Sequence, residues 1–490
     1  KFDKLLFFYL FIWVGNFSEN IDKVMKRLNS LKVWLSVVLL LCFSLSGQAQ
    51  FLRTSYFMEG SSQRMQLNPA LMPGRGYLNI PAIGSLNATV NSSSLGYRDI
   101  MDIIENSDDS DYFMSNDFMN RLDAINNLNV NLSTDILSAG WYKGKNFWSV
   151  NVGLRNDIGA AIPKTMFQFM NNMSSLEFGD NISDYLGINE TINGQKLEIN
   201  SYAEVGVGFA RNITDRLAVG GKVKMLLGIG NLKLNINQIH VETPSVGSSG
   251  VTSKASIQVD ATLENSSKLL ELPENENGDY INEIDFGSFG FAGYGGAIDL
   301  GISYKLLDKL TLSASVLDLG FIKWSKSNTS IARANAEQTY DLLDPASQQE
   351  FINIVNSGEI LNYDMLQLKT EEASEKSRTR GLTSTMVLGA EYALLNDWLV
   401  VGALYTGRFA KPKTLNELTF SACIRPTNAF NVAASYSVLQ GAGKTFGLAL
   451  KLGPFFAGTD YMFFGKNTKN VNAYLGVSIP LGKQKAAEIL

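Results

Sequence analysis

Apolar and polar residues alternate with a strict period of two over long stretches of the chain. From Gly296 to Leu306, one face carries aliphatic and aromatic residues such as Ile298, and the other carries small or charged residues such as Asp299. The pattern breaks at residues 307–309 and then resumes. Since a period of two places alternate side chains on opposite faces of a β-strand, the pattern predicts a β-hairpin over residues 291–324.

The same alternation recurs before and after this hairpin, most clearly over residues 471–481. The first strand, expected near Tyr77 to Val90, is irregular because it contains Pro81 and Gly84. Strands of about ten residues, with one apolar face and one face of Gly, Ser, Thr and isolated charges, are typical of membrane-spanning barrels. We therefore expect an all-β fold, a transmembrane antiparallel β-barrel of about 14 strands.

Short turns and long insertions give this barrel two different ends. Four similar short turns join the strands, at residues 212–217, 305–310, 393–399 and 425–430. Short turns are characteristic of the periplasmic end, so the few helical loop insertions are expected outside the cell. These insertions lie at residues 98–127, 163–190 and 325–381, and the last is expected to be a soluble loop over the barrel mouth.

A secreted β-sandwich or a β-solenoid would show a similar alternation. Two features favour the membrane barrel. Four aromatic residues flank the turn at residues 143–145, as in the girdle at a membrane edge, and the polar faces are rich in glycine.

The N-terminus carries an export signal. The basic start Met25 to Arg27, the uncharged run 33–46 and the small-residue site 47–49 predict a signal peptide over residues 25–49, cleaved before Gln50 and read by the Sec pathway. Residues 1–24 are interpreted as an untranslated or mis-assigned leader. The alternative is an anchor helix, but their apolar run of ten residues is shorter than the roughly 20 that span a bilayer.

Charge and composition narrow the class further. Removal of residues 1–49 takes away six basic and three acidic residues and leaves 36 basic and 44 acidic, a net charge of −8, which argues against a nucleic-acid partner. Cys423 is then the only cysteine, so no intramolecular disulfide can form. The remaining chain has no apolar run of eighteen residues. With a mean hydropathy near zero, these features predict the outer membrane of a Gram-negative bacterium.

Residues 50–76 are dense in turn signals and in apolar bulk, and residues 77–482 and 483–490 are assigned to the barrel and to a short polar tail. A barrel of about fourteen strands is too wide for small inward side chains to fill it, so the N-terminal segment is expected to act as a plug. The residues expected to do so are Phe51, Tyr56, Phe57, Asn68, Pro69 and Leu71.

The candidate chemical motifs do not predict an enzyme or a cofactor. The sequence around Lys444 resembles a phosphate-binding loop, but Val438 stands where that motif needs glycine. The only histidine, His240, is expected to have a surface role. No cluster has metal-ligand spacing, and the acidic run 107–111 lacks the pattern of a calcium loop.

The remaining candidates for a functional site are the charged residues on the polar face of the strands, which should point into the barrel. Such charges either pair across a solvated or plug-filled interior or build a ligand site. Asp318 breaks the alternation and predicts a bulge or a strand end. The charges expected in the lumen are Asp135, Arg155, Glu204, Lys222, Lys224, Asp299, Lys305, Glu391 and Lys451.

Four stretches carry a resemblance: Asn68-Pro69-Ala70, residues 296–304, residues 317–320 with Trp324, and residues 476–482. They resemble an uncharacterised outer-membrane barrel family of the Bacteroidota. That family is similar, more distantly, to the PorP/SprF and PorV proteins of type IX secretion and to the FadL fatty-acid channels. Membership of the FadL-like group implies a fourteen-stranded barrel with an N-terminal plug.

The resemblance implies two functions of different classes. One is a passive channel for small, hydrophobic compounds, as in the FadL group. The other is a non-transporting scaffold for secretion or surface-assembly proteins, as in the PorP/SprF and PorV group. The expected partners are therefore outer-membrane lipid and either a hydrophobic small molecule or secretion or surface proteins, without a cofactor.

Overall fold

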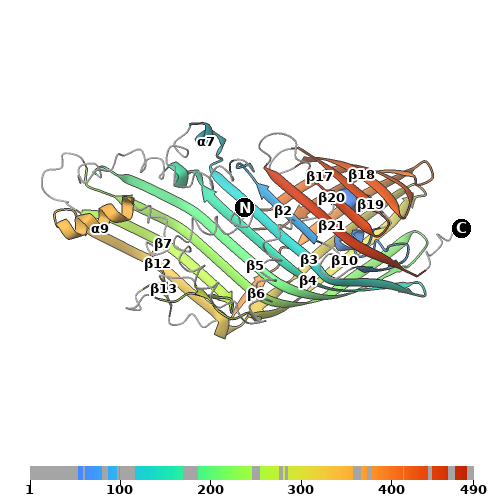
Figure 1. Ribbon diagram of the computed structural model, residues 1–490, viewed down its shortest axis with the longest axis horizontal. Helices are drawn as coiled ribbons and strands as arrows, with labels where there is room; N and C mark the ends of the chain where they lie inside the picture. Colours follow the sequence, from blue (N-terminus) through green and yellow to red (C-terminus); the bar gives the residue numbers. More distant parts are fainter. Residues whose placement is uncertain are drawn as a thin grey trace.

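The computed structural model describes residues 53–482 apart from 59–60, 80–85, 97–98, 100–115, 169–185, 246–253, 275–279, 282–284, 357–365, 372–376, 412, 440–443 and 462–468. Figure 1 shows its elements. The helices are η1 (Thr54–Phe57), α4 (Arg64–Leu67), α7 (Asn116–Arg121), η3 (Lys326–Asn328) and α9 (Pro345–Asn356). The strands are β1 (Gly76–Asn79), β2 (Leu86–Ser92), β3 (Ile125–Lys143), β4 (Asn146–Pro163), β5 (Asn189–Asn212), β6 (Leu217–Glu242), β7 (Lys254–Ser267), β8 (Leu270–Glu271), β9 (Asp285–Phe286), β10 (Gly293–Leu307), β11 (Leu310–Trp324), β12 (Thr329–Asp341), β13 (Lys369–Thr370), β14 (Arg378–Gly381), β15 (Thr385–Leu394), β16 (Leu399–Arg408), β17 (Leu415–Thr427), β18 (Phe430–Leu439), β19 (Thr445–Leu452), β20 (Phe455–Thr459) and β21 (Asn470–Leu481).

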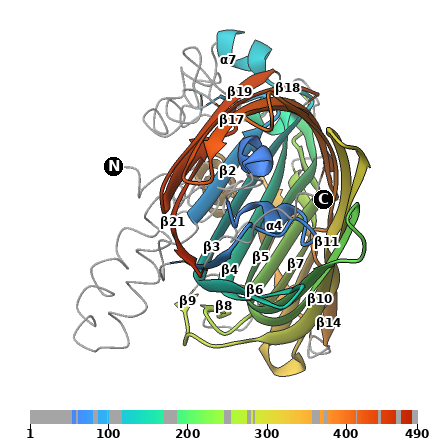
Figure 2. The same cartoon turned by 90° about the vertical axis from the view of Figure 1, so that its right-hand side faces the viewer.

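Antiparallel pairing closes most of these strands into a barrel, seen along its length in Figure 1 and from one end in Figure 2. β1 and β2 share the first position, and β3, β4, β5, β6, β10, β11, β15, β16, β17, β18, β19, β20 and β21 follow in order. β21 pairs again with β1 and β2, which closes the circuit at fourteen strands. The predicted fold class and strand number are confirmed.

The hairpin predicted over residues 291–324 is confirmed as β10 and β11. Its outward face is apolar and exposed, with Ile298 at 41% and Leu300 at 52% of full exposure. The register shifts so that Leu317 and Asp318 together oppose Asp299, and Asp318 has a φ of 58°. This is the β-bulge that the broken alternation at Asp318 predicted.

The tight hairpin turns that the structure describes lie at one end of the barrel, on the right in Figure 1, where β21 also ends. They join β3 to β4, β5 to β6, β10 to β11, β15 to β16, β17 to β18 and β19 to β20. We call this the turn end and the opposite end the loop end. The four similar turns of the sequence all lie at the turn end.

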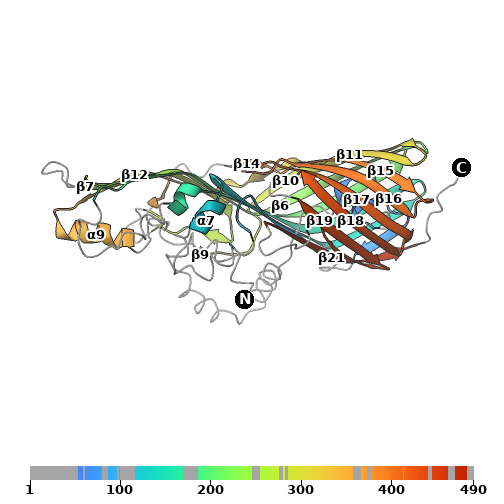
Figure 3. The same ribbon diagram turned by 90° about the horizontal axis from the view of Figure 1, so that it is seen from above.

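At the loop end the strands continue into a second structure, which we call the outer sheet (Figure 3). β6 pairs with β10 up to Gly228 and with β7 from Gly230 onward, so it exchanges neighbours at the rim of the barrel. β12 then pairs with β7 over its whole length, and β13 pairs with β12. The expectation of a soluble loop over residues 325–381 is therefore wrong for β12. Apolar and polar residues alternate along β12, so it can extend the sheet.

The outer sheet has one apolar and one polar face. Its apolar residues, such as Ile236 and Ile257, pack with Phe118 of α7 and with Phe351 of α9 in one buried cluster. The opposite face is polar, and on β12 it exposes Asn335. Within the described residues, no helix is both long and apolar enough to cross a membrane.

The N-terminal segment lies inside the barrel, where Figure 2 shows α4 within the ring of strands. Tyr56, Phe57, Met58 and Leu67 are almost completely buried. They form a cluster with inward residues of the wall, which are Leu317, Val387, Leu404, Cys423, Ala433, Ala449, Phe456 and Tyr474. The lumen is thus filled by apolar bulk that the small inward side chains of the strands do not supply.

Candidate functional site

Two arginines of the N-terminal segment pair with carboxylates of the barrel wall. The Arg53 guanidinium lies 2.8 Å from Glu417 Oε2 and donates to Tyr461 Oη over 2.6 Å. The backbone amides of Arg53 and Thr54 both donate to the Asp460 carboxylate, over 3.1 and 2.8 Å. Charge-assisted bonds of this kind are about twice as strong as neutral ones, so they fix the start of the segment to the wall.

The second arginine, Arg64 of α4, lies 2.9 Å from the Glu391 carboxylate. Arg425 of β17 pairs with the other oxygen of Glu391 at 2.9 Å and donates to the Phe57 carbonyl over 3.1 Å. Glu391 therefore links the segment to the wall through two cations.

The turn at Asn68 and Pro69 fits closely against β6, β10 and β11. The Asn68 side chain donates to the carbonyls of Ile302 and Ala314, over 3.1 and 3.2 Å. A Cβ added at Gly220 would lie 2.3 Å from the Pro69 carbonyl oxygen, well inside van der Waals contact. Glycine on the inner face of β6 therefore permits this close approach.

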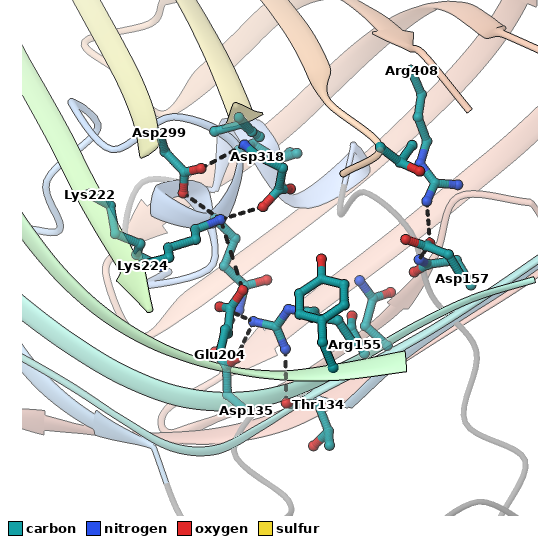
Figure 4. A pocket seen from close by; sticks show the side chains of 18 residues that line it. Thr134, Asp135, Arg155, Asp157, Glu204, Lys222, Lys224, Asp299, Asp318 and Arg408 are labelled. Atoms are coloured by element: carbon teal, nitrogen blue, oxygen red, sulfur yellow. Dashed lines mark hydrogen bonds and ion pairs between the residues drawn. The ribbon is translucent and has the colours of Figure 1, made fainter. Parts of the chain in front are cut away.

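A polar cavity of about 100 Å³ lies in the lumen beside α4, and we call it the luminal cavity. Figure 4 shows its charged side chains converging from facing strands. They comprise five carboxylates and four cations. The lining residues are Gln66, Leu67, Asn87, Asn131, Ser133, Thr134, Asp135, Arg155, Asp157, Tyr202, Glu204, Lys222, Lys224, Asp299, Leu317, Asp318, Thr383 and Arg408.

Ion pairs connect most of these charges (Figure 4). Arg155 lies 2.8 Å from the Asp135 carboxylate and 2.7 Å from that of Glu204. Lys224 lies 2.8 Å from Asp299 and 2.6 Å from Asp318. The bulge positions the Asp318 carboxylate for this contact, and the Asp318 amide donates to Asp299 over 2.8 Å.

A separate pair lies on the other side of the cavity. Arg408 of β16 pairs with Asp157 of β4, and the Asn131 side chain donates to the same carboxylate. Arg408 and Asp157 are 7% and 19% exposed, so the wall is charged on this side as well.

The barrel wall beside the luminal cavity has an interrupted ladder, which we call the seam. β1 pairs with β3 at three positions, and β2 pairs with β3 only at Ser92 opposite Leu128. Between these points, residues 129–137 of β3 have no ladder partner on that side within the described parts of the chain. On its other edge β2 pairs with β21 over residues 86–91.

The seam coincides with the cavity. Asn87 of β2 and four β3 residues, Asn131, Ser133, Thr134 and Asp135, line it from the two sides of the seam. The sequence expected an irregular first strand, and the chain divides there into β1 and β2. Pro81 and Gly84, which motivated that expectation, lie outside the described residues.

The nine charges predicted from the sequence separate into three groups. Six line the luminal cavity: Asp135, Arg155, Glu204, Lys222, Lys224 and Asp299. Glu391 instead holds the N-terminal segment. Lys451 donates to the Asn428 carbonyl near the turn end over 2.7 Å, and Lys305 is exposed beside a hairpin turn.

Of the predicted plug residues, Tyr56 and Phe57 lie in the luminal cluster with Leu71 packed against it. Asn68 and Pro69 form the close turn against the wall. Phe51 lies outside the described residues, as do the predicted leader, the signal peptide and the C-terminal tail.

The sequence reasoning missed several charges that the lumen brings together. An arginine in an apolar segment that enters a barrel needs a buried carboxylate, so Arg53 and Arg64 could have been singled out. Glu417 stands on a strand face that alternates with apolar residues, which is the signal used for Glu391. The missed residues are Arg53, Arg64, Asp157, Asp318, Arg408, Glu417 and Asp460.

Comparison with known proteins gives a family and a set of distant structural likenesses. A family model described as "Family of unknown function (DUF5723)" matches residues 69–460. No curated protein sequence matches the chain.

Three solved structures illustrate the structural likeness. The Ralstonia pickettii toluene transporter TbuX is 10% identical, with 90% of this chain and 100% of that one covered and a TM-score of 0.41. The P. putida toluene transporter TodX is 11% identical, with 90% and 97% covered and a TM-score of 0.36. A Pseudomonas aeruginosa FadL homologue is 10% identical, with 84% and 91% covered and a TM-score of 0.33.

Proposed function

The chain belongs to the DUF5723 family of unknown function, and from this premise we propose that it is an outer-membrane channel through which small hydrophobic compounds pass passively. The proposal includes export through the signal peptide at residues 25–49 and insertion with the turn end in the periplasm.

The outer wall of the barrel supports membrane insertion. Its strands turn large apolar side chains outward, for example Leu300 at 52%, Phe420 at 48% and Leu448 at 45% exposure. Strands paired around nearly the whole circuit leave few unpaired edges in the lipid, as a β-structure in a bilayer requires.

The observation that carries the proposed channel is the seam beside the luminal cavity. The N-terminal segment packs against the inner wall of the barrel, so the proposed route for the solute differs from a straight path along the barrel axis. Within the described residues, the seam is a place where the wall separates lumen and lipid without a continuous hydrogen-bond ladder. A hydrophobic compound gains free energy on entering lipid, whereas a free ion does not, so a lateral route selects compounds with an apolar body.

The experiment locks the seam with a disulfide. An antiparallel register continued from Ser92 and Leu128 would bring Val90 opposite Val130, so V90C and V130C are introduced together with Cys423→Ala. Cells that express the variant are assayed for uptake of naphthalene. Oxidation should abolish the uptake that depends on the protein, and reduction should restore it.

The matched control places a cysteine pair across an intact ladder, at Ala434 and Leu448 of β18 and β19, in the same background. Oxidation of this pair should leave naphthalene uptake unchanged. If the locked seam transports naphthalene as fast as the reduced form, the lateral route is wrong. If the protein gives no uptake above cells without it, the channel function itself is wrong.

A second candidate, a non-transporting scaffold for secretion or surface-assembly proteins, is favoured by the outer sheet. β12 and β7 extend well past the barrel and present a polar face that a channel does not require. Affinity isolation from solubilised membranes discriminates between the two. Stoichiometric protein partners would support the scaffold, and a barrel isolated alone would support the channel.

A further inference from the structure

We propose that the luminal cavity binds a primary ammonium group, so that amphiphilic amines are the cargo class of the channel; this step rests on the proposed function. Three observations carry it: the charge of the cavity, an unpartnered buried acceptor in its lining, and the position of that acceptor at the seam.

The charges of the cavity do not balance. Its five carboxylates are Asp135, Asp157, Glu204, Asp299 and Asp318, and its four cations are Arg155, Lys222, Lys224 and Arg408. With all of them ionised, the cavity carries one net negative charge. An uncompensated charge in a confined, partly desolvated site is costly, and one monovalent cation would neutralise it.

The lining also offers a hydrogen-bond acceptor without a partner. Asn87 is 6% exposed, and its side-chain Oδ1 has no hydrogen-bond partner. An ammonium group has three donors and no acceptor, so it can donate to this oxygen and still reach a carboxylate of the cavity.

Other ligand classes fit less well. Within the described residues, no group of three His, Cys, Asp or Glu is placed to hold a metal ion. An anion would add to the excess negative charge. The volume of about 100 Å³ is well below the roughly 300–1,000 Å³ of sites for drug-sized ligands, so the cavity admits a head group and not a whole drug-sized ligand.

The seam provides for the rest of such a molecule. Asn87 stands on β2, whose ladder with β3 is formed only at Ser92 opposite Leu128 within the described residues. A head group held by Asn87 can therefore extend its alkyl chain between the two strands towards lipid. This geometry assigns the polar lining to the head group and the apolar outer face to the tail.

The test measures binding of defined amines to the folded, full-length mature barrel by titration calorimetry, at constant ionic strength in sodium chloride. Methylammonium represents a free small amine, and hexylammonium represents the head group of an amphiphile, with protein-free micelles as the blank. Both should bind saturably and compete, and hexylammonium should bind about 10-fold more tightly because its tail leaves water. Equal affinities would overturn the assignment to amphiphiles.

Two substitutions of Asn87 are expected to change the affinity for hexylammonium in opposite directions. Asn87→Leu should weaken hexylammonium binding about 10-fold, and Asn87→Asp, which keeps the shape and adds a charge, should strengthen it about 10-fold. Asn335→Leu on the exposed face of the outer sheet is the matched control and should change nothing. Because the two Asn87 variants are predicted to differ in sign, a general loss of folding cannot imitate the result.

The ammonium site would be overturned if hexylammonium bound saturably but with the same affinity to the wild type and to both Asn87 variants. It would also be overturned if no saturable binding were measured. Naphthalene is uncharged, so its uptake through the seam tests the channel independently of this site. Uptake of naphthalene without amine binding would overturn only the ammonium site, and amine binding without uptake would overturn only the channel.

Discussion

The guanidinium of Arg53 lies 2.8 Å from the carboxylate of Glu417, and both side chains are more than nine-tenths buried inside the barrel. The two residues are far apart in the chain, one in the N-terminal segment and one in β17. Their contact means that the segment is attached to the wall by charge as well as by apolar packing.

Removing the Glu417 carboxylate should weaken the attachment of the N-terminal segment to the wall. Glu417→Ala leaves Arg53 buried without its ion-pair partner, and breaking a buried pair in this way costs about 3 kcal/mol. We expect the segment to loosen, so that trypsin cleaves after Arg53 in the variant and not in the wild type. Mass spectrometry of the digested, folded barrel measures the cleavage.

The control is Asp308→Ala, which removes an ion pair with Arg216 at the turn end. These two side chains are 88% and 55% exposed, so their pair contributes little. Equal trypsin sensitivity of the two variants would show that the Glu417 pair does not hold the segment.

Two adjacent glycines of β6 give a second prediction. A Cβ at Gly220 would meet the Pro69 carbonyl at 2.3 Å, whereas at Gly221 the nearest atom is the Asp299 carbonyl oxygen at 3.5 Å. Gly220→Ala should therefore displace the turn at Pro69 and lower the thermal transition of the barrel. Gly221→Ala should be tolerated. Heat-modifiable migration on a detergent gel measures both, and equal transitions would contradict the close fit of the segment.

A third prediction concerns the pH dependence of the outer sheet. Burial raises the pKa of Glu264, but Arg378, Arg380 and Lys233 outweigh it and hold the pKa below its ordinary value. The Arg378 guanidinium lies 2.7 Å from the Glu264 carboxylate and the Lys233 ammonium 3.6 Å from it. A depressed carboxyl pKa stabilises the folded state above the unfolded pKa of about 4.3, and this stabilisation is lost as the pH falls further.

Glu264→Gln should thus make protease resistance of the outer sheet less dependent on pH below about 4.3. Limited pepsin digestion across that range measures it. Asp260→Asn, at an exposed site on the same strand, should keep the wild-type profile. A Glu264→Gln profile parallel to that of the wild type would rule out this role of the carboxylate.

The alternation of residue types was enough to predict the barrel, because each strand must turn one face to lipid and one to the lumen. It predicted the hairpin at 291–324, the bulge at Asp318 and the strand number. It could not separate β7 and β12 from the barrel, since a sheet covered by helices on one face shows the same period of two. The unusual length of β6, 26 residues against about ten for a spanning strand, is the signal for the outer sheet.

The sequence could not predict which luminal charges pair with one another, and the reason is different. Strand faces predict that Glu391 and Lys224 point inward, but the partner depends on which residues meet across the lumen. Arg64 meets Glu391 only because the N-terminal segment folds back as α4 at that height. The seam likewise depends on where the ladder between β2 and β3 is interrupted. No local pattern of residue types predicts that position.

The account depends most directly on the claim that the N-terminal segment closes the lumen, and single-channel conductance in planar bilayers tests it. The intact barrel is compared with a variant that lacks Phe51 to Pro73, after heat-modifiable migration has shown that both are folded. We predict that the intact barrel is closed to ions and that the deletion opens a stable conductance. An intact barrel that conducts as well as the deletion variant would contradict the claim.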